Sequence, residues 1–306
     1  MNQPEVDPRV YASIDDLVRM RSMIGGLSFR SRQPANSLLS GRHGSRIRGR
    51  GLNFEEVRPY HPGDDVRTID WKVTARTRSP HTRVYNEERD RPALLLIDQR
   101  ASMFFGSTRY MKSVTASHVS ALAAWRVLDQ GDRVGAIIFN DELCETHPPK
   151  RSDHHVVRIL TRMTQLNRSL TATTPGVGAP MLSSALEKAE RLAHHGFLVV
   201  IISDFIGLNE IAQRSLRRLA HHNDLIGIAI HDPIASKLPD STRMVVSNGE
   251  LQTEIRPGKL AKDLRSATTQ RLAVVLSLQR KLRAPMLPIS TAEEVLPQLL
   301  RLLGQA

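Results

Sequence analysis

Two aspartates of this chain stand where chemistry is often done in α/β proteins. Asp98 directly follows the apolar run Ala93–Ile97, and Asp204 follows the apolar run Phe197–Ile202 after one serine. If both runs are buried parallel strands, their carboxyl ends meet at the edge of the sheet where open α/β folds bind ligands. Two neighbouring carboxylates repel each other and require a proton or a cation. A hard cation such as Mg²⁺ or Ca²⁺, held by oxygen ligands, is one solution.

Arg100 offers a second solution, because it stands only two residues after Asp98. A guanidinium is permanently charged and suits bidentate pairing with a carboxylate. Placed between Asp98 and Asp204, it would replace the metal and make the sheet edge a structural feature. A metal-dependent hydrolase using the two aspartates needs an open coordination position and an activated water instead. The sequence leaves both alternatives open.

A second group of polar residues lies in the segment Phe54–Arg76, which reads FEEVRPYHPGDDVRTIDWKVTAR. Opposed charges this dense beside apolar residues must be paired or solvated. The segment therefore predicts a folded, salt-bridged arm that serves as a structural clamp, a docking surface for a partner, or both. The candidate residues for this network or surface are Arg58, Asp64, Asp65, Arg67, Asp70, Trp71, Lys72 and Arg76.

Signatures of covalent or nucleotide chemistry do not occur in the sequence. It contains no GxxxxGK[ST] phosphate-binding loop and no strained nucleophile turn of the G-x-S-x-G type. Its single cysteine, Cys144, excludes an internal disulfide framework and a cysteine-based zinc site. We therefore expect no catalytic residues and no resident cofactor other than the metal considered above.

The formal net charge of +12 over 306 residues favours an anionic partner. Nucleic acid is one alternative, because eight arginines and no acid lie between Leu17 and Phe54. Phe29 is the only aromatic residue near them, whereas single-strand binders stack bases on several aromatic side chains. An acidic protein surface is the preferred interpretation. The chain contains no apolar run long enough to span a membrane and no leader-like start, so a cytoplasmic location is expected.

The order of apolar runs predicts the fold class. Four runs are short enough to be strands buried on both faces, and helical patterns separate and follow them. The expected strands are Ala93–Ile97, Val134–Phe139, Phe197–Ile202 and Leu225–Ile230. The expected helices are Arg109–Asp129, His154–Leu166, Leu182–His194, Leu208–His221, Lys259–Leu282 and Thr291–Leu303. This alternation predicts a Rossmann-like α/β domain with a central, mostly parallel sheet.

Composition divides the chain into three expected parts. Residues 1–52 would form an N-terminal helix, within residues 8–28, and a basic flexible arm. Residues 53–91 would form a charged, extended arm around the Pro62–Gly63–Asp64–Asp65 turn. Residues 92–306 would form the α/β domain, with a hairpin around Asn248–Gly249 and C-terminal helices.

The strand-end residues resemble the metal-ion-dependent adhesion site of von Willebrand factor A domains. That site has the pattern Asp-x-Ser-x-Ser after the first strand, a threonine from a middle loop, and an aspartate after a later strand. Asp98, Ser102 and Asp204 match it, whereas Arg100 stands at the first serine position. No hydroxyl residue occupies the threonine position near Gly178–Pro180. The resemblance implies a degenerate site.

The chain as a whole, over about residues 30–303, resembles the bacterial family called domain of unknown function 58. The matching segments are Gly49–Gly51, Phe54–Arg58, Pro62–Asp65, Arg67, Ile69–Lys72, Ala75–Arg76 and the C-terminal stretch TAEEVLPQLLRLL. The resemblance implies a von Willebrand A-like domain with an added arm, and a MoxR-type AAA+ ATPase as partner. We therefore expect a non-enzymatic, protein-binding adaptor in the assembly or remodelling of protein complexes, with a hydrolase or a nucleic-acid binder as alternatives.

Overall fold

The computed structural model describes residues 7–27, 52–87, 91–171, 174, 180–233, 244–247, 252–255 and 259–305. Contacts divide the chain into two units, one of residues 1–31 with 91–306 and the other of residues 32–90. We call the first the α/β unit. The described residues of the second, 52–87, are called the hairpin unit.

The α/β unit is built on a six-stranded sheet in the order β10-β7-β6-β3-β4-β5. Five strands are parallel, and only the edge strand β5 runs antiparallel to its neighbour β4. The strands are β3 (Ala93–Asp98), β4 (Val134–Phe139), β5 (Cys144–Lys150), β6 (Leu198–Ser203), β7 (Asp224–His231) and β10 (Met286–Ser290). The predicted mostly parallel α/β sheet is thus confirmed.

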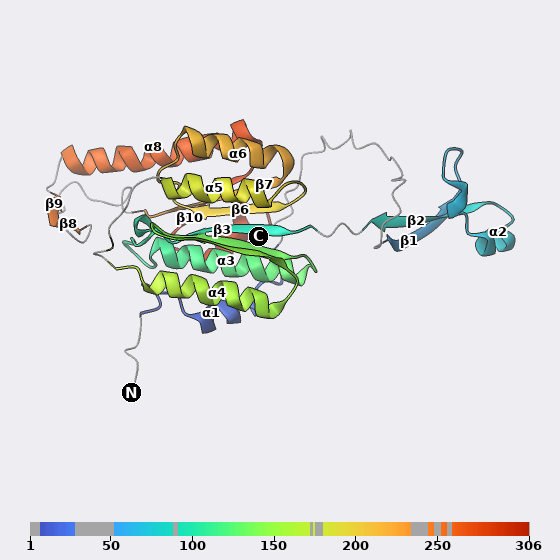
Figure 1. The fold of residues 1–306 in the computed structure, drawn as a ribbon, viewed down its shortest axis with the longest axis horizontal. Helices are drawn as coiled ribbons and strands as arrows, with labels where there is room; N and C mark the ends of the chain where they lie inside the picture. Colours follow the sequence, from blue (N-terminus) through green and yellow to red (C-terminus); the bar gives the residue numbers. More distant parts are fainter. Residues whose placement is uncertain are drawn as a thin grey trace. The chain divides into compact units, whose positions relative to one another are not determined.

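Helices cover both faces of this sheet, as Figure 1 shows. They are α1 (Ile14–Arg19), α3 (Lys112–Asp129), α4 (Asp153–Arg168), α5 (Pro180–Leu192), α6 (Glu210–His222), α8 (Lys259–Leu282) and α9 (Val295–Leu302). Alternate residues of β3 point to opposite faces. Leu95 and Ile97 pack with α1, α3, α4 and α9, whereas Leu94 and Leu96 pack with α5, α6 and α8.

Two strands of the sheet differ from the expected set. The predicted runs correspond to β3, β4, β6 and β7, but β5 and β10 were not expected. β5 has the sequence CETHPPK, whose polar residues and two prolines suit only an edge strand. β10 is five residues long and contains Pro288, which shortens its apolar run. Both strands owe their conformation to pairing with a neighbour more than to their own pattern.

The N-terminal helix belongs to the α/β unit, which differs from the expected division at residue 52. A short α1 and the 3₁₀ helix η1 (Met20–Met23) replace the single helix expected within residues 8–28. Leu17 and Leu27 are fully buried in the core of the α/β unit. The indole Nε1 of Trp125 on α3 donates to the carbonyl oxygen of Leu17 at 2.9 Å. The expected basic arm, residues 29–52, lies outside the described residues except for Leu52, the first residue of the strand β1.

The hairpin predicted around Asn248–Gly249 is confirmed in its strands. β8 (Met244–Ser247) pairs antiparallel with β9 (Gln252–Ile255). The two turn residues themselves lie outside the part of the chain that the structure describes. No helix within the described residues is long and apolar enough to cross a membrane.

The hairpin unit contains a helix where only extended chain was expected. β1 (Leu52–Pro59) and β2 (His81–Glu87) pair antiparallel, and between them lie the 3₁₀ helix η3 (Val66–Thr68) and α2 (Trp71–Thr77). Asp70 caps α2, because its carboxylate accepts from the backbone N–H groups of Lys72 and Val73. The cap satisfies two of the donors that a helix start leaves free. The expectation of purely extended segments in residues 53–90 was therefore wrong over α2.

His118 on α3 makes the stability of the α/β unit sensitive to acid. Burial lowers the pKa of this imidazole to about 4, although the Asp16 and Glu294 carboxylates act in the opposite direction. Since the ordinary pKa of histidine is about 6.5, between pH 6.5 and about 4 the unfolded chain binds a proton that the folded chain does not. The stability that comes from keeping His118 neutral is therefore fully present above pH 6.5. It is lost as the pH falls from 6.5 to about 4.

We expect His118→Gln to reduce this acid sensitivity. Wild-type protein should lose up to about 2 kcal/mol through His118 between pH 7 and pH 4, and the variant should lose correspondingly less. Urea denaturation at several pH values measures the difference. His154→Gln, which changes an exposed imidazole of α4, is the control. Parallel pH profiles of wild type and His118→Gln would contradict the assignment.

Candidate functional site

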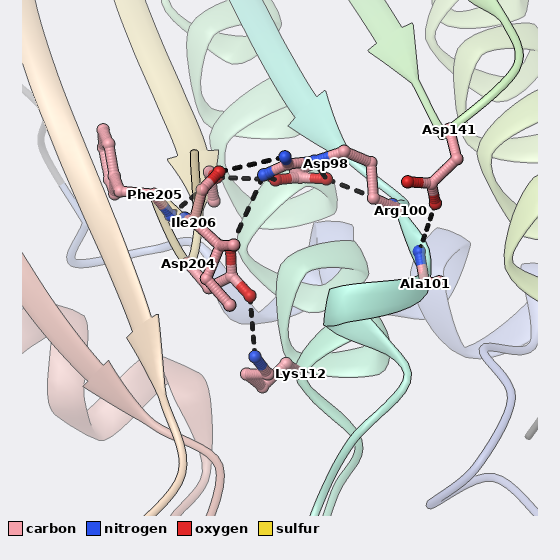
Figure 2. A network of polar contacts seen from close by, with 9 residues as sticks. Asp98, Arg100, Ala101, Lys112, Asp141, Asp204, Phe205 and Ile206 are labelled. Carbon is pink, nitrogen blue, oxygen red and sulfur yellow. Dashed lines mark hydrogen bonds and ion pairs between the residues drawn. The ribbon is translucent and has the colours of Figure 1, made fainter. Parts of the chain in front are cut away.

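The sheet brings the two predicted aspartates together at one edge. Asp98 is the last residue of β3, and Asp204 follows the last residue of β6. These strands are parallel neighbours, so their carboxyl ends lie side by side. Figure 2 shows both carboxylates facing the same small space, together with Arg100 and Lys112. We call these four residues the strand-end cluster.

Arg100 bridges the two aspartates. Its Nη2 and Nε atoms donate to the two carboxylate oxygens of Asp98 at 2.7 and 2.9 Å, a bidentate pair. The same Nη2 lies 3.6 Å from Oδ1 of Asp204. The remaining Nη1 donates to the carbonyl oxygen of Ile206 at 3.0 Å. The guanidinium therefore occupies the position between the carboxylates for which the sequence offered two alternatives, Arg100 or a metal ion.

The turn after Asp204 helps to fix this geometry. Phe205 has φ 55, in the left-handed region that side chains other than glycine rarely adopt. Its ring is buried, and its backbone N–H donates to the hydroxyl of Ser203 at 2.9 Å. The Ser203 hydroxyl in turn donates to Asp98 at 2.6 Å. This tight turn aims the Ile206 carbonyl at Arg100, so the local strain supports the cluster.

Lys112 is the member that sequence reasoning missed. It is the first residue of α3, and its Nζ lies 2.7 Å from Oδ2 of Asp204, on the side away from Arg100 (Figure 2). No local pattern connects residues 92 positions apart in the chain. The available signal was a lone lysine at the start of a helix whose following residues are apolar or small. Such a lysine requires an acidic partner if it is buried.

In the strand-end cluster, opposite charges offset the cost of burying each charged group. The four side chains are between 0% and 9% exposed, and their formal charges sum to zero. Burial alone would raise the pKa of Asp204, but Lys112 and Arg100 hold it below its ordinary value. Burial alone would lower the pKa of Arg100, but the carboxylates of Asp98 and Asp204 outweigh burial and raise this pKa above its ordinary value. Asp204 and Arg100 therefore stay charged at neutral pH.

A divalent cation does not fit the cluster as this chain builds it. Each aspartate already bonds a cationic side chain, and a metal ion would add a third positive centre beside Arg100 and Lys112. Ser102, the third predicted ligand, has a buried hydroxyl with no hydrogen-bond partner among the described residues. Within those residues, no group of three or more metal-binding side chains gathers anywhere. The family's threonine position, residues 178–180, lies mostly outside the described part.

The other strand-end carboxylates are also committed to the structure. Asp141 after β4 accepts from the backbone N–H of Ala101 at 2.6 Å, and burial raises its pKa. Asp232 after β7 accepts from the backbone N–H of Ser107 at 2.8 Å and from the Thr291 hydroxyl at 2.6 Å. These bonds tie the loop after β3 to neighbouring strand ends. They leave the sheet edge as a rigid polar surface.

The second set of predicted residues divides into two groups in the hairpin unit. Arg58 forms a bidentate pair with Asp64, with both distances 2.8 Å. Arg83, which was not predicted, binds Asp70 at 2.8 Å. Hydrogen bonding to their arginine partners lowers the pKa of Asp64 and of Asp70. The carboxylate of Asp65 caps η3. These contacts hold the turn and α2 against the hairpin.

The remaining predicted residues point to solvent. They are Arg67 on η3 and Trp71, Lys72 and Arg76 on α2, all of them exposed. Trp71 is 71% exposed, which is unusual for the largest apolar side chain. The sequence did not separate these residues from the structural group, because the charges alternate along the chain without regard to where each side chain points.

Comparisons with known proteins place the chain in a family. A family model described as "Protein of unknown function DUF58" matches residues 56–274. Uncharacterized proteins of Mycobacterium bovis and Mycobacterium tuberculosis are 31% identical over 298 residues, which covers 94% of this chain and 90% of each relative. The crystal structure of an uncharacterized membrane spanning protein from Vibrio fischeri matches 63% of this chain and 98% of its own, at 16% identity. Its TM-score of 0.24 is too low to establish a shared fold. By the family model and the mycobacterial relatives, this chain belongs to the DUF58 family.

Proposed function

We propose that this chain is a non-enzymatic, protein-binding adaptor. The observation that carries the proposal is the occupancy of both strand-end aspartates by Arg100 and Lys112. A carboxylate that already accepts a charged hydrogen bond is a poor general base, and it leaves no open coordination position for an activated water. What remains at this edge is a buried, neutralised network that supports the loops around it, which suits recognition better than chemistry.

We further infer that the α/β unit is of the von Willebrand A type. The support is the placement of Asp98, Ser102 and Asp204 around the ends of β3 and β6, in the order that such adhesion sites use. In this interpretation Arg100 and Lys112 replace the metal ion of that site. Recognition at the sheet edge would then be independent of divalent cations.

The proposed partner is a MoxR-type AAA+ ATPase, or a client protein that the ATPase remodels. The support is the resemblance of the Phe54–Arg76 segment to a family whose members are encoded beside such ATPases. The net charge of +12 favours an acidic surface on that partner.

Binding measurements with purified proteins test the proposal. In one isothermal calorimetry experiment, the full chain is titrated into the MoxR-type ATPase of the same bacterium. In separate experiments, Mg²⁺, Mn²⁺ and Ca²⁺ are titrated into the full chain. We expect saturable binding of the ATPase and no heat of binding for the metal ions. Tight metal binding by the full chain would favour the hydrolase alternative. Absence of any complex with the ATPase would remove the proposed partner.

A further inference from the structure

The hairpin unit presents an apolar and basic face that its own structure does not use. Trp71 and Ala75 are one helical turn apart on α2, and so are Lys72 and Arg76. All four are exposed, whereas Val73 and Thr74 on the other side of the helix are partly covered. A seven-residue helix that turns its tryptophan outward and a valine and a threonine inward is the reverse of ordinary amphipathic packing.

The surroundings of Trp71 extend this face. Val66 on η3 is 60% exposed, and Arg67 and Arg78 are exposed as well. Of the carboxylates within described residues 57–83, Asp64 binds Arg58, Asp70 binds Arg83, and Asp65 caps η3 through the backbone N–H of Arg67. We call Val66, Arg67, Trp71, Lys72, Ala75 and Arg76 the Trp71 face. Among described residues 57–83, no carboxylate pairs with its three cations.

Hydrogen bonds at both ends of α2 hold the backbone that carries the face. Asp70 fixes the start of α2, and a backbone hydrogen bond of 2.8 Å joins the Asp70 N–H to the carbonyl of His81 on β2. At its end, the Arg78 N–H bonds the Thr74 carbonyl, and Thr77 donates to Ser79 and contacts His81. An aromatic side chain on a backbone that is already ordered costs less conformational entropy on binding than one on a flexible segment. Exposed Trp and Arg on a rigid support are the residues that dominate binding energy at protein interfaces.

We propose that the Trp71 face docks an acidic protein surface that carries an apolar side chain for Trp71. The partner is acidic because no carboxylate of described residues 57–83 pairs with the three cations of the face, and a second copy of this chain, at +12, would repel it. A protein is favoured over nucleic acid because the exposed apolar residues on η3 and α2 besides Trp71 are aliphatic, Val66 and Ala75, whereas single-strand binders stack bases on several aromatic rings. This proposal rests on the adaptor function proposed above, because that function makes the partner a protein. It adds the surface that binds and the chemistry of the partner.

Trp71 supplies its own signal for a direct test. The chain has two tryptophans, and Trp125 is only 2% exposed, so Trp71 accounts for the solvent-exposed part of the emission. The probe is a tryptophan-free helical peptide of glutamate and leucine, with a lysine and leucine peptide as its counterpart. We expect the acidic peptide to shift the emission to shorter wavelength and the basic peptide to leave it unchanged. Trp71→Phe should abolish the shift.

Charge reversal locates the contact. Lys72→Glu/Arg76→Glu should weaken binding of the acidic peptide by at least about tenfold. The matched control is Arg214→Glu/Arg217→Glu, the same change of charge on exposed arginines of α6 in the α/β unit, which should alter the affinity by less than about threefold. Circular dichroism verifies that each variant is folded. Equal weakening by the two double variants, or no emission shift with the acidic peptide, would overturn the proposal.

Two further arms separate this inference from the proposed function. If oligothymidylate shifts the Trp71 emission at a lower concentration than the acidic peptide, the face is a nucleic-acid site and the inference fails. The same variants are then titrated with the MoxR-type ATPase. If Lys72→Glu/Arg76→Glu loses ATPase binding and the control double variant keeps it, both the adaptor function and the Trp71 face as its contact surface are supported. If Lys72→Glu/Arg76→Glu binds the ATPase as wild type does, the adaptor function stands and the Trp71 face is rejected as the contact surface. An ATPase that does not bind wild type removes that partner, and the peptide arms still decide the chemistry of the face.

Discussion

Asp98→Ala is expected to lower the free energy of unfolding by about 3–5 kcal/mol. The change removes the carboxylate that accepts from both Nε and Nη2 of Arg100, whose side chain is only 5% exposed. The buried guanidinium then keeps its hydrogen bond to the Ile206 carbonyl at 3.0 Å, and the carboxylate left in its ion pairs is Asp204, at 3.6 Å. The hydroxyl of Ser203 also loses its acceptor. Urea or guanidinium denaturation of the full chain measures the loss.

Two comparison variants show whether the loss of stability comes from leaving a buried charge without its partner or only from losing an ion pair. Glu293→Ala removes the partner of Arg301 from an ion pair whose side chains are 56% and 63% exposed, and should cost no more than about 1 kcal/mol. Asp98→Leu/Arg100→Met replaces the buried pair by apolar groups of similar size and should recover much of the loss. If Asp98→Ala cost as little as Glu293→Ala, the cluster would not be the buried network described here.

Local pattern was sufficient to predict the parts of the fold that are buried on both faces. β3, β4, β6 and β7 are runs of large aliphatic residues in a chain that alternates them with helices, and few structures other than a covered parallel sheet satisfy both features. β5 and β10 could not be found in this way, because a polar edge strand and a proline-containing strand carry no such run. Their conformation is decided by the backbone groups of β4 and β7 beside them.

The strand-end cluster was half predictable for a related reason. Asp98 and Arg100 are two residues apart, so their pairing follows from local geometry, and Asp204 follows from the rule that parallel strands end together. Lys112 depends on how α3 is set against the end of β6, which no local pattern encodes. The same limit applies to Leu17 and Trp125, whose contact assigns the N-terminal helix to the α/β unit across 108 positions.

The two units use their charges in different ways. In the strand-end cluster every charge faces an opposite charge out of contact with water, so the charges fix a shape and leave little attraction for a partner. In the hairpin unit the carboxylates of Asp64 and Asp70 hold the backbone, and no carboxylate of described residues 57–83 pairs with the cations of the Trp71 face. In the proposal above, attraction of an acidic partner therefore belongs to the hairpin unit, and the buried charges of the strand-end cluster support the sheet edge.

Lys112 changes what is needed to convert the strand-end cluster into a metal site. Arg100→Ser with Ala179→Thr would supply the two hydroxyls that the adhesion-site pattern lacks, but Lys112 would still donate to Asp204. We therefore expect Arg100→Ser/Ala179→Thr to respond weakly to Mg²⁺. Adding Lys112→Ser removes the second cation and leaves Asp98 and Asp204 without neutralising partners. This triple variant should be destabilised in EDTA, because two buried carboxylates then repel each other.

Divalent cations should restore the triple variant. A ligand that binds only the folded state at 100 times its Kd stabilises by about 2.7 kcal/mol. Thermal unfolding in EDTA, Mg²⁺ and Ca²⁺ measures the gain, and wild-type protein should unfold at the same temperature in all three. A wild type stabilised by Mg²⁺ would show that Arg100 and Lys112 do not exclude the metal. A triple variant that folds but ignores both ions would show that the strand ends of this chain no longer hold the geometry of an adhesion site, whichever side chains fill it.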